Sequence, residues 1–502
     1  MSESQLLKVL FYLEPRIEKG QPAWKDVWAK MYVNYIDHIN KTAHSRYEFF
    51  LVLGDAQKHF IEQLSHLNNI SFHIVSQCQL RAIYSSPSQQ QQEMYENQQS
   101  ESRRQLGEFY RGLLGDFEPD IIWSFVSPVP FFKDLFPDVL ILNQELGMLG
   151  RSPLPLTWYL DPFGTFSNSL IARNFEQIKG FQIGRRERVF VAELRHLYRT
   201  AISKADRIKK SDIDPKNEFA FLALLPLQYN GHFIFDAMCD YDSQFALLTD
   251  VLDRTPKSIG VIVTEHKNPI CDVVLHPSCV QYLSATYSNF IYKPELDKYT
   301  NSSLMILNIV DAVISVSSTL GMQGRFLGKA LVALGESQLT PMASVGKLED
   351  LYDFLSGAID DHTNLDGFFY YLLSRYYIPE KNYLENGSWL DLYLTKMLDL
   401  HKSKKIDWES VPPIDTTENL LQFYRDKAMG ELIVHEVQSQ PATSTDVWNA
   451  DNSDGPQGLK REMRNLRKEN KVLKQAIEEL RLSVSWKLTA PLRKLADILG
   501  YK

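Results

Sequence analysis

The sequence has 502 residues, of which 44% are hydrophobic and 23% are charged, which is enough apolar material for two sizeable cores. A formal net charge of −8 argues against a general nucleic-acid-binding protein, whose binding surface is normally basic. The four cysteines form no CxxC pair and no Cys/His cluster with zinc-ligand spacing, so we expect a reducing cytoplasmic compartment. No DxD-like pair stands at the end of a predicted strand, so we expect no metal ion, and we expect no cofactor. We expect no signal peptide and no membrane span.

Short apolar runs alternate with helical patterns along the first half of the chain. This alternation is typical of a parallel sheet with helices packed on its faces. A long polar helix is expected over residues 174–210. We therefore predict a first Rossmann-like domain over residues 1–212, and we expect it to bind the acceptor. Its predicted strands are residues 7–13, 48–55, 70–75, 120–126 and 138–143.

The second half of the chain repeats this rhythm. A second Rossmann-like domain is predicted over residues 213–360, followed by helices over residues 361–435 that pack on the body. The predicted fold class is therefore α/β, with two domains of the same kind. The strands expected in the second domain are residues 218–228, 258–266, 288–293, 311–318 and 330–337.

The last part of the chain has a different composition. Residues 436–457 are typical of a disordered linker. Residues 458–484 carry a heptad pattern, and Asn470 at an a position favours a parallel homodimer through residues 459–484. One amphipathic helix docked on the body is the alternative. Residues 485–502 form an amphipathic tail that could rest on an anionic membrane or simply end the coiled coil.

The motif with the clearest chemical meaning lies between residues 311 and 335. A predicted strand ends in hydroxyl side chains, reaches a glycine and enters a helix, and another strand follows. Backbone N–H groups at such a helix start, together with hydroxyls, can hold a phosphate. Capping of the helix by the same residues is the alternative. The candidate donor-binding residues of this motif are Ser317, Ser318, Thr319 and Gly321.

Two carboxylates and one histidine are further candidates. Glu145 follows a strand at the carboxyl end of the sheet, where α/β proteins bind ligands; a solvated loop carboxylate is the alternative. Asp236 lies among aromatic residues that could tune an acid, base or nucleophile, and a helix N-cap is the alternative. His266 ends a predicted strand and could contact a donor, although such a histidine is often an ordinary surface group.

Arginines could bind an anionic acceptor or a substrate carboxylate through bidentate hydrogen bonds. The candidates are Arg151 and Arg173, while Arg185 and Arg186 lie in a polar helical pattern that is more typical of a solvated face.

Three blocks resemble the bacterial capsule-polysaccharide and Kdo-transferase superfamily, which includes retaining β-Kdo transferases and the Kdo-capping transferase of certain O-antigens. They are NQELGMLGRSPLPLTWYLDPFGTFSNS (143–169), LLPLQ (224–228), and VSSTLG with GKALVALG (316–335), in the family's order. The resemblance spans residues 120–350. It implies a GT-B fold, in which two Rossmann-like domains face a cleft, with CMP-β-Kdo as the donor and a carboxylate as the nucleophile.

The resemblance also implies roles for single residues. Two successive displacements would give retention, with Asp236 as the nucleophile and Glu145 as the general acid/base. Gln228 of the LLPLQ block and His266 would help the hydroxyl residues to hold CMP. The acidic residue follows Leu-Gln at a longer spacing here than in the family, and the alternative nucleophiles are Asp240 and Asp242.

Two other functions stay open at this point. The same fold could use a nucleoside-diphosphate sugar, or the chain could be an inactive GT-B-like scaffold that recruits partners through its coiled coil. The leading hypothesis is a glycosyltransferase of bacterial surface-polysaccharide biosynthesis. Its expected partners are a CMP-sugar donor and a polysaccharide or glycolipid acceptor, at the inner face of the cytoplasmic membrane.

Overall fold

The computed structural model describes residues 6–17, 26–43, 46–64, 66–86, 89–90, 93, 100–125, 129–149, 155–204, 208–228, 233–265, 273–299, 302–359 and 363–428. The chain divides into two compact units, residues 1–437 and 438–502, and the described residues belong to the first. The predicted linker at 436–457, coiled coil at 458–484 and tail at 485–502 lie outside the described residues.

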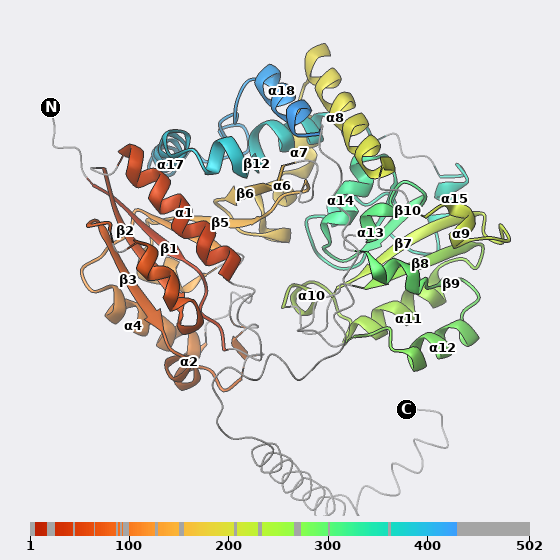
Figure 1. Cartoon of the computed structure of the whole chain (residues 1–502), viewed down its shortest axis with the longest axis horizontal. Helices are drawn as coiled ribbons and strands as arrows, with labels where there is room; N and C mark the ends of the chain where they lie inside the picture. The colour runs from red at the N-terminus through yellow and green to blue at the C-terminus, as the bar shows by residue number, and fades with distance from the viewer. Residues whose placement is uncertain are drawn as a thin grey trace, which may run out of the picture. The chain divides into compact units, whose positions relative to one another are not determined.

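The first sheet has seven strands in the order β12-β6-β5-β4-β1-β2-β3 (Figure 1). β1 pairs with β2 and with β4 in parallel register, while β6 and β12 add antiparallel strands at one edge. Most strand residues are apolar on both faces because helices cover both faces. The bounds are β1 Leu7–Tyr12, β2 Tyr47–Gly54, β3 Ile70–Val75, β4 Ile121–Phe125, β5 Leu140–Leu146, β6 Thr157–Asp161 and β12 Ile378–Pro379.

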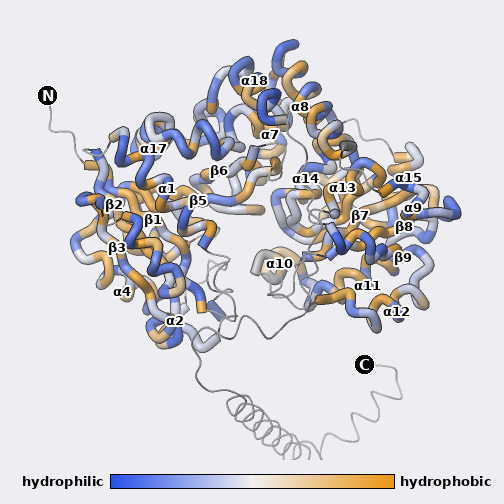
Figure 2. The backbone as a smooth tube through the Cα atoms, viewed as in Figure 1, coloured by the Kyte–Doolittle hydropathy of each residue, from blue (hydrophilic) through white to orange (hydrophobic). Residues whose placement is uncertain are grey.

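Two hydrophobic clusters hold the first sheet. On one face, Phe11 and Trp123 stack with ring centroids 5.1 Å apart beneath helix α1. On the other face, Tyr12 packs against Tyr110 of α4 and Phe132 of α5. Figure 2 shows the apolar strands inside and the polar helix faces outside. The helices are α1 Asp26–Ala43, η3 Asp55–Leu64, α2 Gln77–Ile83, α4 Glu101–Leu114 and α5 Phe131–Leu135.

A helical segment connects the two sheets. The helix expected over residues 174–210 is interrupted, because Gly180 ends α7 and Gly184 immediately precedes α8. α8 has 20 residues and is the longest helix of the described part of the chain. The connecting elements are η4 Phe166–Asn168, α6 Leu170–Arg173, α7 Phe175–Lys179, α8 Arg185–Lys204 and α9 Lys210–Ile213.

The second sheet has five parallel strands in the order β11-β10-β7-β8-β9. Its strands are β7 Phe221–Leu227, β8 Ile259–Glu265, β9 Phe290–Ile291, β10 Ala312–Ser315 and β11 Ala330–Ala333. Its helices are α10 Phe233–Met238, α11 Gln244–Arg254, α12 Pro277–Thr286, η5 Pro294–Lys298, α13 Ser302–Met305, α14 Thr319–Phe326, η6 Thr340–Met342 and α15 Leu351–Leu355.

The chain then returns to the first sheet. β12 pairs with β6, and α17 packs on α1, where a Cβ on Gly387 would lie only 2.0 Å from the backbone oxygen of His38. α18 runs parallel to α8, since Arg186 pairs with Glu418 and Glu193 with Arg425. The returning elements are α16 Asp366–Tyr371, η7 Leu372–Tyr376, η8 Glu380–Leu384, α17 Gly387–Lys402 and α18 Thr417–Ala428.

This architecture confirms the predicted α/β class with two Rossmann-like domains. Each predicted strand corresponds to an observed one, but the antiparallel strands β6 and β12 were not predicted. The limits proposed for the domains stay predictions.

Candidate functional site

Glu145 lies at the carboxyl end of β5, as predicted, although the strand continues to Leu146. In the antiparallel pair with β6 it stands opposite Tyr159, so the two side chains share one face of the sheet. Tyr159 is buried and stacks on Tyr376 at 5.0 Å. The carboxylate is half-buried, and one of its oxygens accepts a hydrogen bond of 2.8 Å from the N–H of Leu146. The predicted alternative of a freely solvated loop residue therefore does not describe its surroundings.

These surroundings change the acidity of Glu145. Burial raises the pKa of its carboxyl to about 7, whereas the Leu146 N–H and the charge of Arg16 act in the opposite direction. A carboxyl that titrates near neutral pH can both accept and release a proton at that pH. Glu145 therefore has the acidity expected of a general acid/base.

A hydrogen-bonded pair joins two strand ends of the second sheet. The side-chain amide of Gln228, just after β7, donates to Ser317 Oγ at 3.1 Å, just after β10. The N–H of Gln228 donates to Gln244 Oε1, also at 3.1 Å. β7 and β10 are neighbours in the sheet, so the structure brings these predicted donor-binding residues together. They lie at carboxyl ends of parallel strands, where such sheets bind ligands.

The predicted helix start is present at α14. Ser318 is its N-cap, and Ser318 Oγ accepts from the N–H of Leu320 at 3.3 Å. Thr319 is the first helical residue. Gly321 is needed for packing, because a Cβ there would lie 2.7 Å from a methyl group of Leu339. The capping alternative thus describes Ser318, while donor binding by Ser318, Thr319 and Gly321 stays a prediction.

The candidate nucleophiles occupy different elements. Asp236 is on α10, whose last residue is Met238. Asp240 and Asp242 lie beyond its end, in the exposed bend before Ser243 caps α11. Asp240 lines a cavity of about 570 Å³ next to the end of β11.

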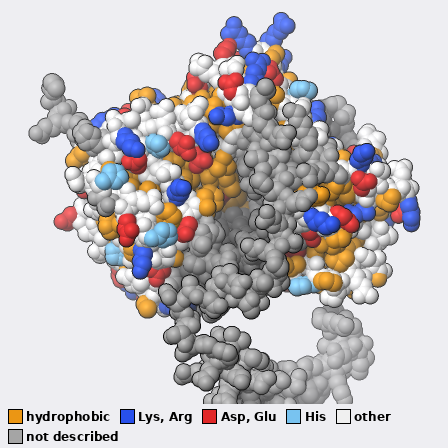
Figure 3. All heavy atoms as spheres, viewed as in Figure 1, with side chains coloured by type: hydrophobic (Ala, Val, Ile, Leu, Met, Phe, Trp, Pro, Cys, Tyr) orange, Lys and Arg blue, Asp and Glu red, His pale blue; other side chains and the backbone are white. Residues whose placement is uncertain are grey.

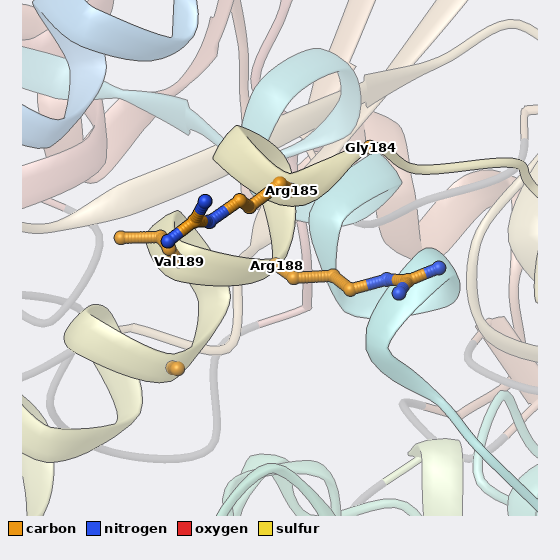
Figure 4. A pocket seen from close by; sticks show the side chains of 5 residues that line it. Gly184, Arg185, Arg188 and Val189 are labelled. Atoms are coloured by element: carbon orange, nitrogen blue, oxygen red, sulfur yellow. The ribbon is translucent and has the colours of Figure 1, made fainter.

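The arginine candidates are spread over separate elements. Arg173 ends α6, is exposed, and donates to Asn168 Oδ1 at 3.1 Å. Arg185 and Arg188 leave α8 in opposite directions, so their guanidinium groups do not converge on one ligand (Figure 4). Arg186 pairs with Glu418, and both are exposed. Figure 3 shows Lys and Arg side chains projecting where α8 and α18 lie. Two candidates, Arg151 and His266, lie outside the described residues.

The two strand-end sites are physically connected. The side-chain amide of Gln323 on α14 donates to the carbonyl oxygen of Met148 at 2.6 Å. The hydroxyl of Tyr377 contacts Met322 Sδ at 2.7 Å, and a Cβ on Gly147 would lie 2.9 Å from the ring of Tyr377. The segment that follows Glu145 therefore packs on the helix that begins after Ser317.

One polar pair was not predicted from the sequence. Arg16 and Glu14, directly after β1, are joined by two hydrogen bonds of 3.0 and 2.9 Å. Polar residues that immediately follow a buried strand were the available signal. Their pairing could not be foreseen, because residues far away in the chain position the loop.

Within the described residues, no three His, Cys, Asp or Glu side chains come together as metal ligands. None of the helices in this part of the chain is long and apolar enough to cross a membrane.

No family model and no curated protein sequence matches the chain. Among solved structures, the KpsC β-Kdo 2,7-transferase of Thermosulfurimonas dismutans is similar, with 13% identity, 78% of this chain and 99% of that chain covered, and a TM-score of 0.40. The KpsC β-Kdo 2,4-transferase of the same organism has 16% identity, 50% and 79% coverage and a TM-score of 0.33.

A putative UDP-N-acetylglucosamine 2-epimerase from Listeria monocytogenes has 9% identity, 80% and 99% coverage and a TM-score of 0.30.

Proposed function

We propose that the chain is a glycosyltransferase that transfers Kdo from CMP-β-Kdo, with retention, to a polysaccharide or glycolipid acceptor in bacterial surface-polysaccharide biosynthesis. The observation that carries this proposal is Glu145, whose carboxyl has a pKa of about 7 at the carboxyl end of β5. The connection from Met148 to Gln323 supports it further, because this contact joins the strand end of Glu145 to the helix beside the proposed donor site.

In the first step, the Asp236 carboxylate attacks the anomeric carbon of the donor, and the bond to the CMP oxygen breaks. CMP leaves with the bonding electron pair, and a Kdo–enzyme ester forms. Gln228, Ser317, Ser318, Thr319 and His266 would bind the departing phosphate and stabilise its charge through fixed donors.

In the second step, an acceptor hydroxyl attacks the same carbon and displaces Asp236. Glu145 takes the hydroxyl proton as the new bond forms, so the carboxylate of Asp236 is regenerated. Two inversions give net retention. At neutral pH a carboxyl with a pKa of about 7 is present in both its acid and its base form, so a substantial fraction can accept the proton.

Mass spectrometry of the intact protein tests the covalent step. The wild-type chain, incubated with CMP-Kdo and no acceptor, should gain the mass of one Kdo residue. Asp236→Asn should gain nothing, and Asp240→Asn, outside α10, should behave as the wild type. An adduct that disappears only in Asp240→Asn or only in Asp242→Asn would show that this residue, and not Asp236, is the nucleophile.

The same preparation separates the alternatives. Turnover of a nucleoside-diphosphate sugar in place of CMP-Kdo would favour the other donor class within the same fold. If the chain neither hydrolyses nor transfers any donor, the inactive scaffold is favoured.

We also propose that residues 459–484 form a parallel two-stranded coiled coil and that residues 485–502 contact the cytoplasmic face of a membrane. Asn470 in the heptad pattern supports the first part, because its amide pairs best with its counterpart in a parallel dimer. Light scattering of the full chain should find a dimer, and a chain ending at residue 435 should be monomeric. A monomeric full chain would contradict the coiled coil.

A further inference from the structure

Helix α8 is strongly basic, although the chain as a whole is acidic. Its 20 residues include six Lys or Arg and two Glu, whereas the chain has a formal net charge of −8. The helix packs on the body through buried residues at intervals of four, Phe190, Leu194 and Tyr198. Residues at this spacing lie on one side of a helix, so the other side of α8 faces solvent. None of the residues in the proposed reaction comes from this helix.

Exposed side chains form one stripe along the solvent side of α8. We call this stripe the α8 face, and its exposed members are Arg185, Arg188, Val189, Ala192 and His196. Separations of three and four residues connect them, which places them on the same side of the helix. The first four, together with Gly184, line an open depression of about 450 Å³ (Figure 4). The α8 face contains no acidic residue, and neither of its arginines forms an ion pair with a described residue.

Two ion pairs border the α8 face on the side of α18. Arg186 pairs with Glu418, and Glu193 pairs with Arg425. Each pair is electrically neutral, so these carboxylates do not offset the charge of the α8 face. The remaining acid of the helix, Glu187, is half-buried, and its position in the sequence places it toward the opposite side of α8. The α8 face therefore has a net positive charge.

The geometry of the two arginines does not suit a single small anion. Arg185 and Arg188 leave the helix in opposite directions (Figure 4), whereas bidentate recognition of one anion needs donors that converge. Charges that are spread apart suit a plane that carries many phosphate groups. Figure 3 shows Lys and Arg side chains projecting where α8 and α18 lie, so such a plane can reach them. Val189, which is 50% exposed, adds apolar surface beside the charges, as in helices that lie on a bilayer.

We propose that the α8 face binds the surface of an anionic membrane, with Arg185 and Arg188 donating hydrogen bonds to lipid phosphate groups and Val189 and Ala192 lying against the headgroup layer. Charge complementarity carries the proposal, because an anionic surface attracts a basic stripe and repels the rest of an acidic chain. The contact therefore orients the body on the membrane. It is separate from residues 485–502, and it goes beyond the proposed function because it requires neither donor nor acceptor.

Sedimentation of the full chain with vesicles measures the partition coefficient. The vesicles are phosphatidylcholine with about one third phosphatidylglycerol, and pure phosphatidylcholine vesicles are the reference. The wild type should bind the anionic vesicles more tightly, and added NaCl should release it, because salt screens the attraction. Arg185→Gln/Arg188→Gln should lower the partition coefficient for anionic vesicles at least about tenfold, since one basic residue near such a surface contributes about fivefold.

Two further variants separate this surface from the overall charge of the chain. Arg104→Gln/Arg111→Gln makes the same change in net charge at two exposed arginines of α4 and should leave the partition coefficient within about twofold. Ala192→Lys adds a positive charge to the α8 face and should raise the partition coefficient about fivefold. Lysine is a good helix former, so this gain is measured in a folded helix.

Four results would overturn the proposal. Equal binding of the wild type and Arg185→Gln/Arg188→Gln would leave any membrane contact to residues 485–502 alone. An equal loss in Arg104→Gln/Arg111→Gln would show an effect of net charge only. Release of the wild type by inorganic phosphate but not by chloride at the same ionic strength would indicate a site for a single anion. A different mass of Arg185→Gln/Arg188→Gln in light scattering without vesicles would make the α8 face an interface between copies of the chain.

CMP is titrated separately in every variant, and its affinity should not change. A wild-type chain that binds CMP but shows no preference for anionic vesicles would overturn this inference and leave the proposed function in place. A chain that binds anionic vesicles through the α8 face but does not bind CMP would do the reverse.

Discussion

The side-chain amide of Gln323 donates a hydrogen bond of 2.6 Å to the backbone oxygen of Met148, although 175 positions separate them in the sequence. Gln323 is on α14, which packs with the second sheet. Met148 lies two residues after Leu146, the last residue of β5 in the first sheet. The bond is buried, so no water replaces it. It connects the element that carries Glu145 with the helix that starts at Thr319.

Replacing Gln323 with leucine should therefore weaken this connection. The carbonyl of Met148 would stay buried without a donor, which costs about 1–3 kcal/mol of unfolding free energy. Urea denaturation measures this loss. Gln182→Leu is the control, because Gln182 also donates to a carbonyl, that of Gly180, but is exposed, and its change should stay within about 0.5 kcal/mol. Equal losses in the two variants would contradict a special role for the buried bond.

Ser317→Ala should reduce the affinity for CMP about tenfold or more. The change removes the acceptor of the Gln228 amide and a hydroxyl of the proposed donor site. Calorimetry with CMP, UDP and GDP measures it, and the wild type should prefer CMP. Ser243→Ala removes the N-cap of α11 and should lower stability by about 1 kcal/mol without changing CMP affinity. Unchanged CMP binding in Ser317→Ala would remove this residue from the donor site.

The raised pKa of Glu145 predicts a pH dependence of stability. Folding raises this pKa from 4.5 to about 7, so the folded state holds the proton more tightly. The resulting stabilisation is complete below pH 4.5 and is lost as the pH rises through 7. Glu145→Gln has no carboxyl to titrate, so it does not lose this stabilisation as the pH rises. The unfolding free energy of Glu145→Gln minus that of the wild type should therefore increase by about 1–3 kcal/mol between pH 4.5 and 8.

Urea titrations of both proteins across this pH range give the comparison. In activity measurements, the transfer rate of the wild type should rise with pH, with an apparent pKa near 7. Glu145→Gln should lose most of the activity, and its remaining rate should not show this rise. A stability difference that does not change with pH would show that Glu145 titrates normally.

Asp161 should be a structural carboxylate. Its two oxygens accept from the N–H groups of Phe163, Gly164 and Leu170 and from the hydroxyl of Tyr376. Burial nevertheless raises its pKa to about 6. Asp161→Asn places an amide N–H₂ against donors, so we expect a loss of about 2–5 kcal/mol in urea denaturation, against about 1–2 kcal/mol for Tyr376→Phe. A neutral outcome for Asp161→Asn would contradict this network.

Two glycine-to-alanine changes should act in opposite directions. A Cβ at position 387 would collide with the backbone oxygen of His38, so Gly387→Ala should lower the melting temperature through separation of α17 from α1. Gly112, in the exposed face of α4, has no heavy atom within 4 Å of its added Cβ. Gly112→Ala should raise stability by about 0.5–1 kcal/mol, because alanine favours the helix. Calorimetric melting compares them.

Much of the fold could be predicted because its parallel strands are buried on both faces. Runs such as Leu7–Tyr12 and Ile259–Glu265 are mostly apolar and lie between helical patterns. The strand β12, with only Ile378 and Pro379, is too short to have a period, and its partner Trp158 lies far away in the sequence, before all the strands of the second sheet.

The candidate site could be predicted only where a side chain follows its own strand. Glu145, Gln228 and Ser317 end strands, and the positions of all three agree with that reasoning. The Arg16–Glu14 pair depends on contacts from Gln77 and Gln90, and such long-range contacts leave no local pattern.

The place of β12 in the first sheet has a consequence for synthesis. Chains fold from the N-terminus as they leave the ribosome, yet the strand that covers the edge of β6 is made only after β7 to β11 are complete. Until then β6 presents unpaired backbone groups, which can template pairing with other chains. A nascent chain that stalls before β12 is made therefore exposes an aggregation-prone edge at β6. Once β12 is made, it covers this edge within the same chain.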